Sequence, residues 1–279
     1  MWALCRFLNQ QVKTTMATAV ATSNHSEFFK RLSAANNRIL LLDYDGTIAP
    51  FSARRDCAFP YPKVAELVAF IMNKCRTRVS VITGRPAREF CRVLQVEPRP
   101  EIWGSHGLER LRADGSYEAS HVEEGALNVL GEAVAWLEFE GLASATEVKH
   151  GAVAVHWRGL PLDQVQQVRT CAYRVLSALA GIAGLSLCEF DCGLELRARR
   201  ASKGDAVDIL LSEVEDDVPV AYLGDDLTDE YAFRALAGRG LTVLVRSTYR
   251  FTAAQTWIRP PEELVQFLTD WARACGGDL

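Results

Sequence analysis

Asp43 and Asp45 stand two positions apart at the end of an almost continuous apolar run that begins at Arg38. Carboxylates at this spacing after a buried strand can lie side by side around a cation, and one can attack a substrate while the other handles protons. Gly46 lets the backbone turn sharply behind them, and Thr47 completes the segment as a supporting residue. The segment predicts a nucleophilic and acid–base centre at a strand end.

Three further segments carry groups that suit an anionic substrate. Thr83-Gly84-Arg85 offers a hydroxyl and an exposed backbone amide where a helix begins, which is a natural grip for an oxyanion. Lys203 stands at the start of a later helix and supplies a cation. Residues 224–230 follow another apolar run and hold four acids, which repel one another unless a divalent cation such as Mg²⁺ neutralises them. These acids are Asp225, Asp226, Asp229 and Glu230.

Hydrolysis of a phosphate monoester is the reaction that these groups favour. A carboxylate with a pKa near ~3.9 is already ionised at neutral pH, so Asp43 needs no base to act as a nucleophile. It must approach an anionic phosphate, and Mg²⁺, Lys203 and the Thr83 segment would offset the repulsion. Asp45 could protonate the leaving oxygen and then activate water.

Alternating strand and helix signals must position these residues. Near-continuous apolar strands are typical of a parallel sheet that is buried on both faces. We therefore expect an α/β fold, a doubly wound and mostly parallel Rossmann-like core, with the reactive residues at the carboxyl ends of its strands. The expected strands are 38–44, 78–83, 218–223 and 241–245, and the expected helices are 63–75, 88–94, 203–212, 228–236 and one beginning at Pro261.

An inserted module with a different pattern interrupts this core. It begins with a hairpin turn at Asp114-Gly115 and continues with helices and short strands, which suggests an α+β unit. Its expected helices are 123–140 and 162–180, and its expected strands are 146–150, 152–157, 185–190 and 193–197. We expect residues 1–25 to be a loose tail, residues 26–112 and 198–279 to form the catalytic core, and residues 113–197 to form an α+β cap.

Composition excludes several classes of protein. The 279 residues include 35 acidic and 31 basic side chains, and this net charge of −4 disfavours nucleic-acid binding. No apolar run is long enough for a membrane-spanning helix. Eight scattered cysteines without a Cys-x-x-Cys pair are typical of a reducing compartment. We expect a cytoplasmic monomer that acts on a small molecule and binds neither nucleic acid nor membrane.

The four reactive segments, in this order, resemble the motifs of haloacid-dehalogenase-like phosphatases. The quoted stretches are LLLDYDGT, VITGR, the lysine of SKGDAV, and YLGDDLTDE. The resemblance implies that Asp43 is the nucleophile and Asp45 the general acid and base. It also implies that Mg²⁺ is held by the Asp43 carboxylate, the Asp45 backbone carbonyl and Asp225, with Asp229 in a supporting role. Asp226 is a further candidate for a supporting acid.

A narrower resemblance is to trehalose-6-phosphate phosphatases. It lies in the stretches GSHGLE around His106, EVK to HWR at residues 147–158, ELR at residues 195–197, and GDDLTDEYAF. In that family the insert is a mobile cap whose acids and lysine grip the second glucose. The resemblance implies that Glu147, Lys149 and Glu195 contact sugar, and His106, Gly84 and Arg85 are candidate substrate contacts.

Other functions remain open at this point. A phosphatase for sucrose 6-phosphate or mannosyl-phosphoglycerate would use the same core, and a hexose phosphomutase uses a similar nucleophile, acid and cap. A catalytically silent sugar-phosphate sensor is also possible, although such a protein has no need to keep both Asp43 and Asp45. Glu147, Lys149 and Glu195 could also be cross-strand ion pairs on a sheet face.

Overall fold

An eight-stranded sheet is the centre of the computed structural model, which describes residues 25–52, 57–199 and 202–277. Its strand order is β12-β11-β10-β1-β2-β3-β4-β5. The first six strands run parallel, and β4 and β5 add antiparallel pairs at one edge. The strands are β1 (Arg38–Leu42), β2 (Thr77–Ile82), β3 (Glu101–Gly104), β4 (Glu109–Leu111), β5 (Tyr117–Ala119), β10 (Val220–Gly224), β11 (Leu241–Val245) and β12 (Thr256–Ile258).

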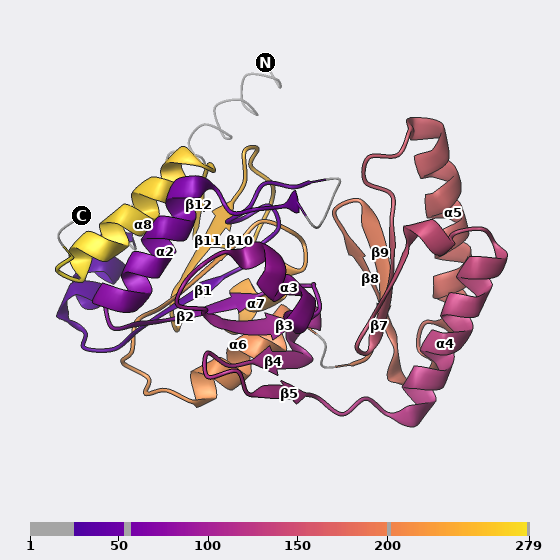
Figure 1. The fold of residues 1–279 in the computed structure, drawn as a ribbon, viewed down its shortest axis with the longest axis horizontal. Coiled ribbons are helices and arrows are strands. Elements are labelled where there is room, and N and C mark those ends of the chain that lie inside the picture. The colour runs from indigo at the N-terminus through magenta and orange to yellow at the C-terminus, as the bar shows by residue number, and fades with distance from the viewer. Residues whose placement is uncertain (1–24, 53–56, 200–201, 278–279) are drawn as a thin grey trace, which may run out of the picture.

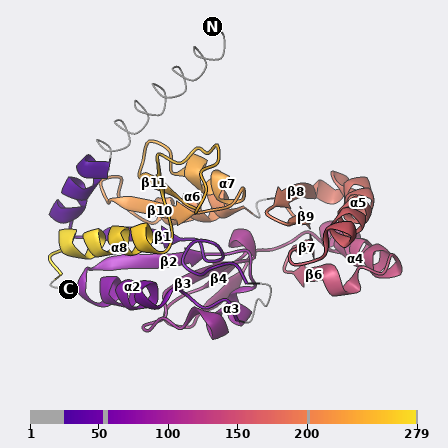
Figure 2. The ribbon, with the colours of Figure 1, turned by 90° about the horizontal axis from the view of Figure 1, so that it is seen from above.

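Helices cover both faces of this sheet, as Figures 1 and 2 show. Alternate residues of β1 point to opposite faces, so Leu40 and Leu42 join one core cluster while Ile39 and Leu41 join another. The first cluster packs under α2 (Pro62–Lys74), α3 (Ala87–Leu94) and α8 (Glu262–Ala274), and the second under α6 (Lys203–Ser212) and α7 (Asp229–Ala235). This is a doubly wound core, as the sequence predicted.

A four-stranded antiparallel sheet forms a second, smaller unit beside the carboxyl ends of the central strands. Its order is β6-β7-β9-β8, with β6 (Thr146–Lys149), β7 (Ala152–His156), β8 (Ser186–Phe190) and β9 (Gly193–Arg197). Two helices, α4 (Glu124–Phe139) and α5 (Leu162–Leu179), cover its outer face through a separate apolar core. Figure 1 shows the opposite face turned toward the larger sheet.

Most of the expected elements are present, and the differences have clear causes. Strands β3 and β12 were not predicted, because they are only four and three residues long and carry no period-2 signal of their own. Strand β5 belongs to the larger sheet, so the chain enters the smaller unit after residue 119 and not at residue 113. The expected tail falls outside the described residues except for residue 25, where a described helical stretch, 25–34, begins. Within the described ranges, none of the helices has the length and apolar character needed to cross a membrane.

Candidate active site

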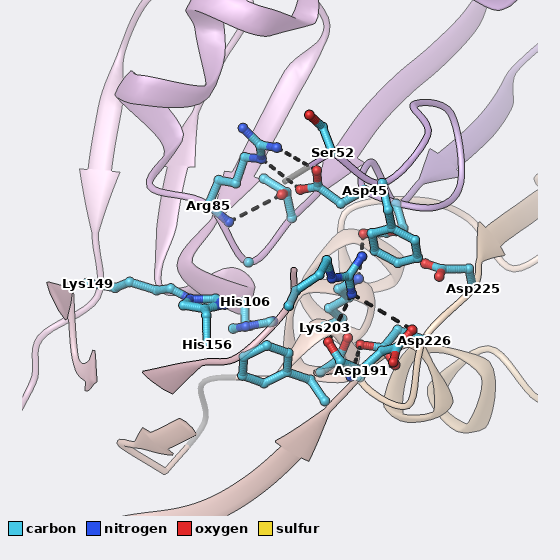
Figure 3. Close-up of a pocket in the computed structure, with 17 residues that line it drawn as sticks. Asp45, Ser52, Arg85, His106, Lys149, His156, Asp191, Lys203, Asp225 and Asp226 are labelled. Atoms are coloured by element: carbon cyan, nitrogen blue, oxygen red, sulfur yellow. Dashed lines mark hydrogen bonds and ion pairs between the residues drawn. The ribbon is translucent and has the colours of Figure 1, made fainter. Parts of the chain in front are cut away.

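A cavity opens between the carboxyl ends of the central strands and the inner face of the smaller sheet (Figure 3). Residues of both units line it, which places the reactive segments of the core opposite polar side chains of the insert. Its floor comes from loops after β1, β2 and β10, three adjacent strands of the sheet. The lining residues include Asp43, Asp45, Thr83, Gly84, Arg85, His106, Lys149, His156, Arg158, Asp191, Lys203, Asp225 and Asp226.

Strand register brings the acidic groups together. Leu42 pairs with Leu223 and with Val81, so the residues that follow β1, β2 and β10 emerge at one edge. The Asp43 amide still donates to the Leu223 carbonyl at 2.8 Å, which holds Asp43 in line with its strand. Lys203 reaches the same point from the first turn of α6, where Ser202 and Asp205 form a capping box.

Asp43 lies in a fully buried ionic cluster. Its Oδ1 accepts from Lys203 Nζ at 2.5 Å and its Oδ2 accepts from the Thr47 hydroxyl at 2.9 Å. The same Lys203 ammonium donates to Asp229 Oδ1 at 2.7 Å. Burial raises the pKa of Asp43 to about 7, although the neighbouring Lys203 opposes this shift. The pKa of Lys203 is raised despite burial, because Asp229 and Asp43 stabilise its charged form.

Asp225 carries a buried carboxylate oxygen that lacks a hydrogen-bond donor. Its side chain is 1% exposed, and Oδ2 accepts no hydrogen bond from the described part of the chain. Burial and the nearby Asp43 and Asp229 raise the Asp225 pKa well above its usual range. A Cβ on Gly46 would lie 2.3 Å from this oxygen, so only glycine lets the first loop approach so closely.

This cluster fits a divalent cation. Asp43, Asp225 and Asp229 present oxygens within 4.8 Å of one another, and the Lys203 ammonium contacts Asp43 and Asp229. Asp229 is an unsuitable ligand, because its two oxygens already accept from Lys203, from the Tyr222 hydroxyl and from the amides of residues 225 and 226. Asp43 and Oδ2 of Asp225, which accepts no hydrogen bond from a described residue, therefore remain as carboxylate ligands suited to Mg²⁺.

Asp45 is held by Arg85 rather than by the acidic cluster. Arg85 donates from Nε to Oδ2 at 2.7 Å and from Nη2 to Oδ1 at 2.5 Å, a bidentate geometry that fixes the orientation of the carboxylate. Arg85, expected as a substrate contact, thus contacts Asp45 in this structure. Thr83 is 1% exposed, and its hydroxyl accepts from the Arg85 amide at 3.2 Å, which fixes the loop after β2.

His106 stands against Gly84 on the wall of the cavity. A Cβ on Gly84 would lie 2.7 Å from the imidazole, so this glycine makes room for the ring. His106 Nε2 is 3.2 Å from Glu195 Oε2, and the pKa of Glu195 lies well below its usual range because Lys149 and His106 oppose the effect of burial. An ionised carboxylate only accepts, so Nε2 carries the proton and Nδ1 is bare. No described residue donates to Nδ1.

The buried His106 makes stability depend on pH. Burial lowers the pKa of His106 from 6.5 to about 4, although Glu195 opposes this shift, so this histidine is neutral in the native state and its protonation works against folding. The contribution of neutral His106 to the free energy of unfolding is complete above pH 6.5 and is lost as the pH falls toward 4. Between pH 7.5 and pH 5 we expect the wild type to lose about 2 kcal/mol more unfolding free energy than His106→Asn.

Urea unfolding of both proteins at the two pH values measures this difference. Asn suits the positive φ of 57° at this position, so the variant keeps the backbone. The exposed His121→Asn variant is the control, and it should follow the wild type. Parallel losses in wild type and His106→Asn would show that His106 does not carry the effect.

The expected sugar-contacting residues form an ion-pair chain on the smaller sheet. Lys149 Nζ lies 2.8 Å from Glu195 Oε1 and 3.6 Å from Glu147 Oε2, and Glu147 also contacts His156 Nε2 at 2.8 Å. Lys149 and His156 line the cavity. Glu195 is only 1% exposed and contacts Lys149 and His106, so in this arrangement it acts on the cavity through its neighbours.

Several residues at the cavity were missed by the sequence analysis. Asp191, in the turn between β8 and β9, donates its backbone amide to both oxygens of Asp226 at 3.2 and 3.1 Å. Phe51 follows the first motif, and the Arg158 guanidinium lies 3.7 Å from the centre of its ring. Arg246 reaches the site from the end of β11. Single charged or aromatic residues outside a motif gave no signal by which to select them.

The fold is shared with solved structures described as a phosphatase of the haloalkanoate (HAD) enzyme superfamily and as a haloacid dehalogenase-like hydrolase, each with a TM-score of 0.59 and 14% sequence identity. The C-terminal domain of Candida albicans trehalose-6-phosphate phosphatase has this fold with a TM-score of 0.70 and 18% sequence identity, covering 91% of this chain and 97% of that domain.

Sequence comparison narrows the class to one family. Residues 41–255 match the model of the trehalose-phosphatase family, and the chain belongs to this family. Trehalose-phosphate phosphatase B of Arabidopsis thaliana is 29% identical over 269 residues, which cover 86% of this chain and 68% of that protein. An uncharacterized glycosyl hydrolase of Mycobacterium tuberculosis is 32% identical over 258 residues, covering 87% of this chain and 19% of that protein. The chain thus spans about a fifth of the length of this last relative.

Proposed function

We propose that this protein hydrolyses trehalose 6-phosphate to trehalose and phosphate in a magnesium-dependent reaction. The observation that carries the proposal is the buried Asp43, paired with Lys203, beside the Asp225 oxygen that accepts no hydrogen bond from a described residue. Membership of the trehalose-phosphatase family and the polar side chains on the opposite wall support the choice of a disaccharide phosphate. We also propose that the smaller sheet with α4 and α5 acts as a cap that sets specificity.

Asp43 is the proposed nucleophile. One of its oxygens attacks phosphorus, the bond from phosphorus to the sugar oxygen breaks, and Asp45 delivers a proton to that oxygen so that trehalose leaves. Lys203 and the Thr83 loop offset the repulsion between the carboxylate and the phosphate. Mg²⁺, held by Asp43, the Asp45 backbone carbonyl and Asp225, would supply further charge neutralisation at the phosphoryl oxygens.

Water completes the cycle by attacking the phosphorus of the phosphorylated Asp43. Asp45 takes a proton from this water, phosphate leaves and the Asp43 carboxylate is restored. The bidentate pair with Arg85 holds the Asp45 carboxylate in one orientation. For the first half of the cycle Asp45 must carry a proton. An anionic phosphate that attracts the Arg85 guanidinium would weaken the Arg85–Asp45 ion pair.

A substrate panel tests the proposed function. Phosphate release from trehalose 6-phosphate should exceed that from sucrose 6-phosphate, glucose 6-phosphate and mannosyl-phosphoglycerate, and chelation of magnesium should remove it. Equal or better turnover of another panel member would overturn the trehalose assignment. Interconversion of hexose phosphates that needs a bisphosphate and gives no net phosphate would indicate a mutase.

Lys149→Ala should lower activity on the disaccharide selectively. We expect kcat/KM for trehalose 6-phosphate to fall about 100-fold, because a charged hydrogen bond to a sugar hydroxyl contributes about 1.5–3 kcal/mol. Turnover of p-nitrophenyl phosphate, which has no second sugar, should change by less than about threefold. Both kcat/KM values are measured on the same preparation.

Val148→Ala is the matched control, because Val148 is on the same strand and is 62% exposed. It should leave both substrates unaffected. Equal losses on the sugar and the aryl phosphate in Lys149→Ala would refute the specificity role, because Lys149 would then act on the core or on stability.

A further inference from the structure

The turn between β8 and β9 makes a compact set of contacts with the loop that presents Asp225. Figure 3 shows Asp191 of this turn beside Asp226. The Asp191 amide donates to both Asp226 oxygens, and the Leu227 amide donates to Asp226 Oδ1 at 2.7 Å. These bonds occupy the Asp226 carboxylate, so Asp226 serves to dock the turn rather than to hold a cation.

The Asp191 side chain faces two arginines. Its Oδ2 lies 3.6 Å from Arg246 Nη2 and 3.8 Å from Arg158 Nη2, and Arg158 also donates to the Asp191 carbonyl at 2.9 Å. Arg158 belongs to the same small unit as Asp191, whereas Arg246 belongs to the core. The Asp191–Arg246 pair therefore forms only when the turn is docked.

Arg246 is shared between Asp191 and Asp225. Its Nη1 lies 3.7 Å from Asp225 Oδ2, the oxygen without a hydrogen-bond donor, and 3.5 Å from the Asp225 carbonyl. A cation bound at Oδ2 and the Arg246 guanidinium are both positive and compete for the same oxygen. The Asp191 carboxylate, on the other side of Arg246, attracts the guanidinium and so weakens its interaction with Asp225.

We propose that Asp191 is a positioning residue that, by pairing with Arg246 when the β8–β9 turn docks, favours cation binding at Asp225. Docking of the turn and binding of Mg²⁺ then assist each other, because a coupling between two equilibria acts equally in both directions. The inference rests on the magnesium site of the proposed function, but it does not depend on which sugar phosphate is hydrolysed.

Isothermal titration of the purified full chain with Mg²⁺ alone tests the coupling without turnover. We expect Asp191→Asn to weaken Mg²⁺ binding about three- to fivefold, the range that suits partly exposed ion pairs. Asp191→Glu, which restores the charge, should recover most of the loss. Arg246→Gln should bind Mg²⁺ at least as tightly as the wild type, and adding Asp191→Asn to it should change nothing further.

Glu189→Gln is the control, because Glu189 is an exposed acid on β8 that pairs with Arg169. It should leave the Kd for Mg²⁺ unchanged. The proposal is overturned if Asp191→Asn binds Mg²⁺ like the wild type, if it weakens binding equally in the Arg246→Gln background, or if the wild type binds no Mg²⁺. If the wild type hydrolyses trehalose 6-phosphate but Asp191→Asn leaves the Kd for Mg²⁺ unchanged, only the coupling is refuted. If Asp191→Asn weakens Mg²⁺ binding as expected but the wild type does not hydrolyse trehalose 6-phosphate, only the proposed function is refuted.

Discussion

Asp43→Asn should abolish phosphate release from trehalose 6-phosphate, with a loss of at least about 10⁴-fold in kcat. The amide keeps the size of the carboxylate but has no anionic oxygen to attack phosphorus. The Asp43→Asn protein should lose little stability, because burial already raises the pKa of Asp43 to about 7 and a buried charge at this position is costly. Phosphate release and thermal unfolding are measured together.

Asp208→Asn is the control for this variant, because Asp208 is an exposed acid on α6. It should retain full activity. Residual activity of a folded Asp43→Asn protein within about tenfold of the wild type would mean that another group attacks phosphorus, since the loss of a nucleophile costs far more.

Asp45→Asn should separate the two halves of the reaction. A sugar alkoxide is a poor leaving group, so loss of the general acid should slow the first turnover of trehalose 6-phosphate by about 10²–10⁴-fold. p-Nitrophenolate leaves without a proton, so its first turnover should be affected far less. Because water activation also needs Asp45, the phosphorylated enzyme should accumulate, and rapid mixing should show a burst of p-nitrophenol followed by slow turnover.

Arg85→Lys is the companion variant for this experiment. It keeps a positive charge near Asp45 but removes the bidentate geometry seen in the structure, so its losses should be smaller than those of Asp45→Asn. If Asp45→Asn slows the first turnover of the sugar phosphate and of the aryl phosphate equally and shows no burst, Asp45 does not act as the general acid.

The gathering of the core motifs could be predicted from sequence because it follows from topology. Asp43, Thr83 and Asp225 each come directly after an apolar strand, and the carboxyl ends of parallel strands share one edge of a sheet. The position of Lys203 could be predicted as well, because it lies at the start of a helix. Short strands such as β3 were missed, since their pairing depends on neighbours that are distant in sequence.

Contacts between the two units could not be derived in the same way. The pairing of Asp191 with Asp226 and Arg246 depends on how the insert sits over the core, and no periodicity records that placement. The cross-strand register places Glu147, Ala154 and Glu195 in one row, as alternation predicts. The strand register does not predict that Lys149 and His106 cover Glu195, because His106 comes from a loop of the other unit.

Trapping the covalent intermediate tests the central claim most directly. Wild-type protein mixed with trehalose 6-phosphate and Mg²⁺ is quenched with borohydride, which reduces an acyl phosphate to an alcohol, and the peptides are analysed by mass spectrometry. The account predicts reduction of Asp43 to homoserine, dependent on substrate and absent in Asp43→Asn. Reduction at another carboxylate, or none while phosphate is released at the normal rate, would contradict it.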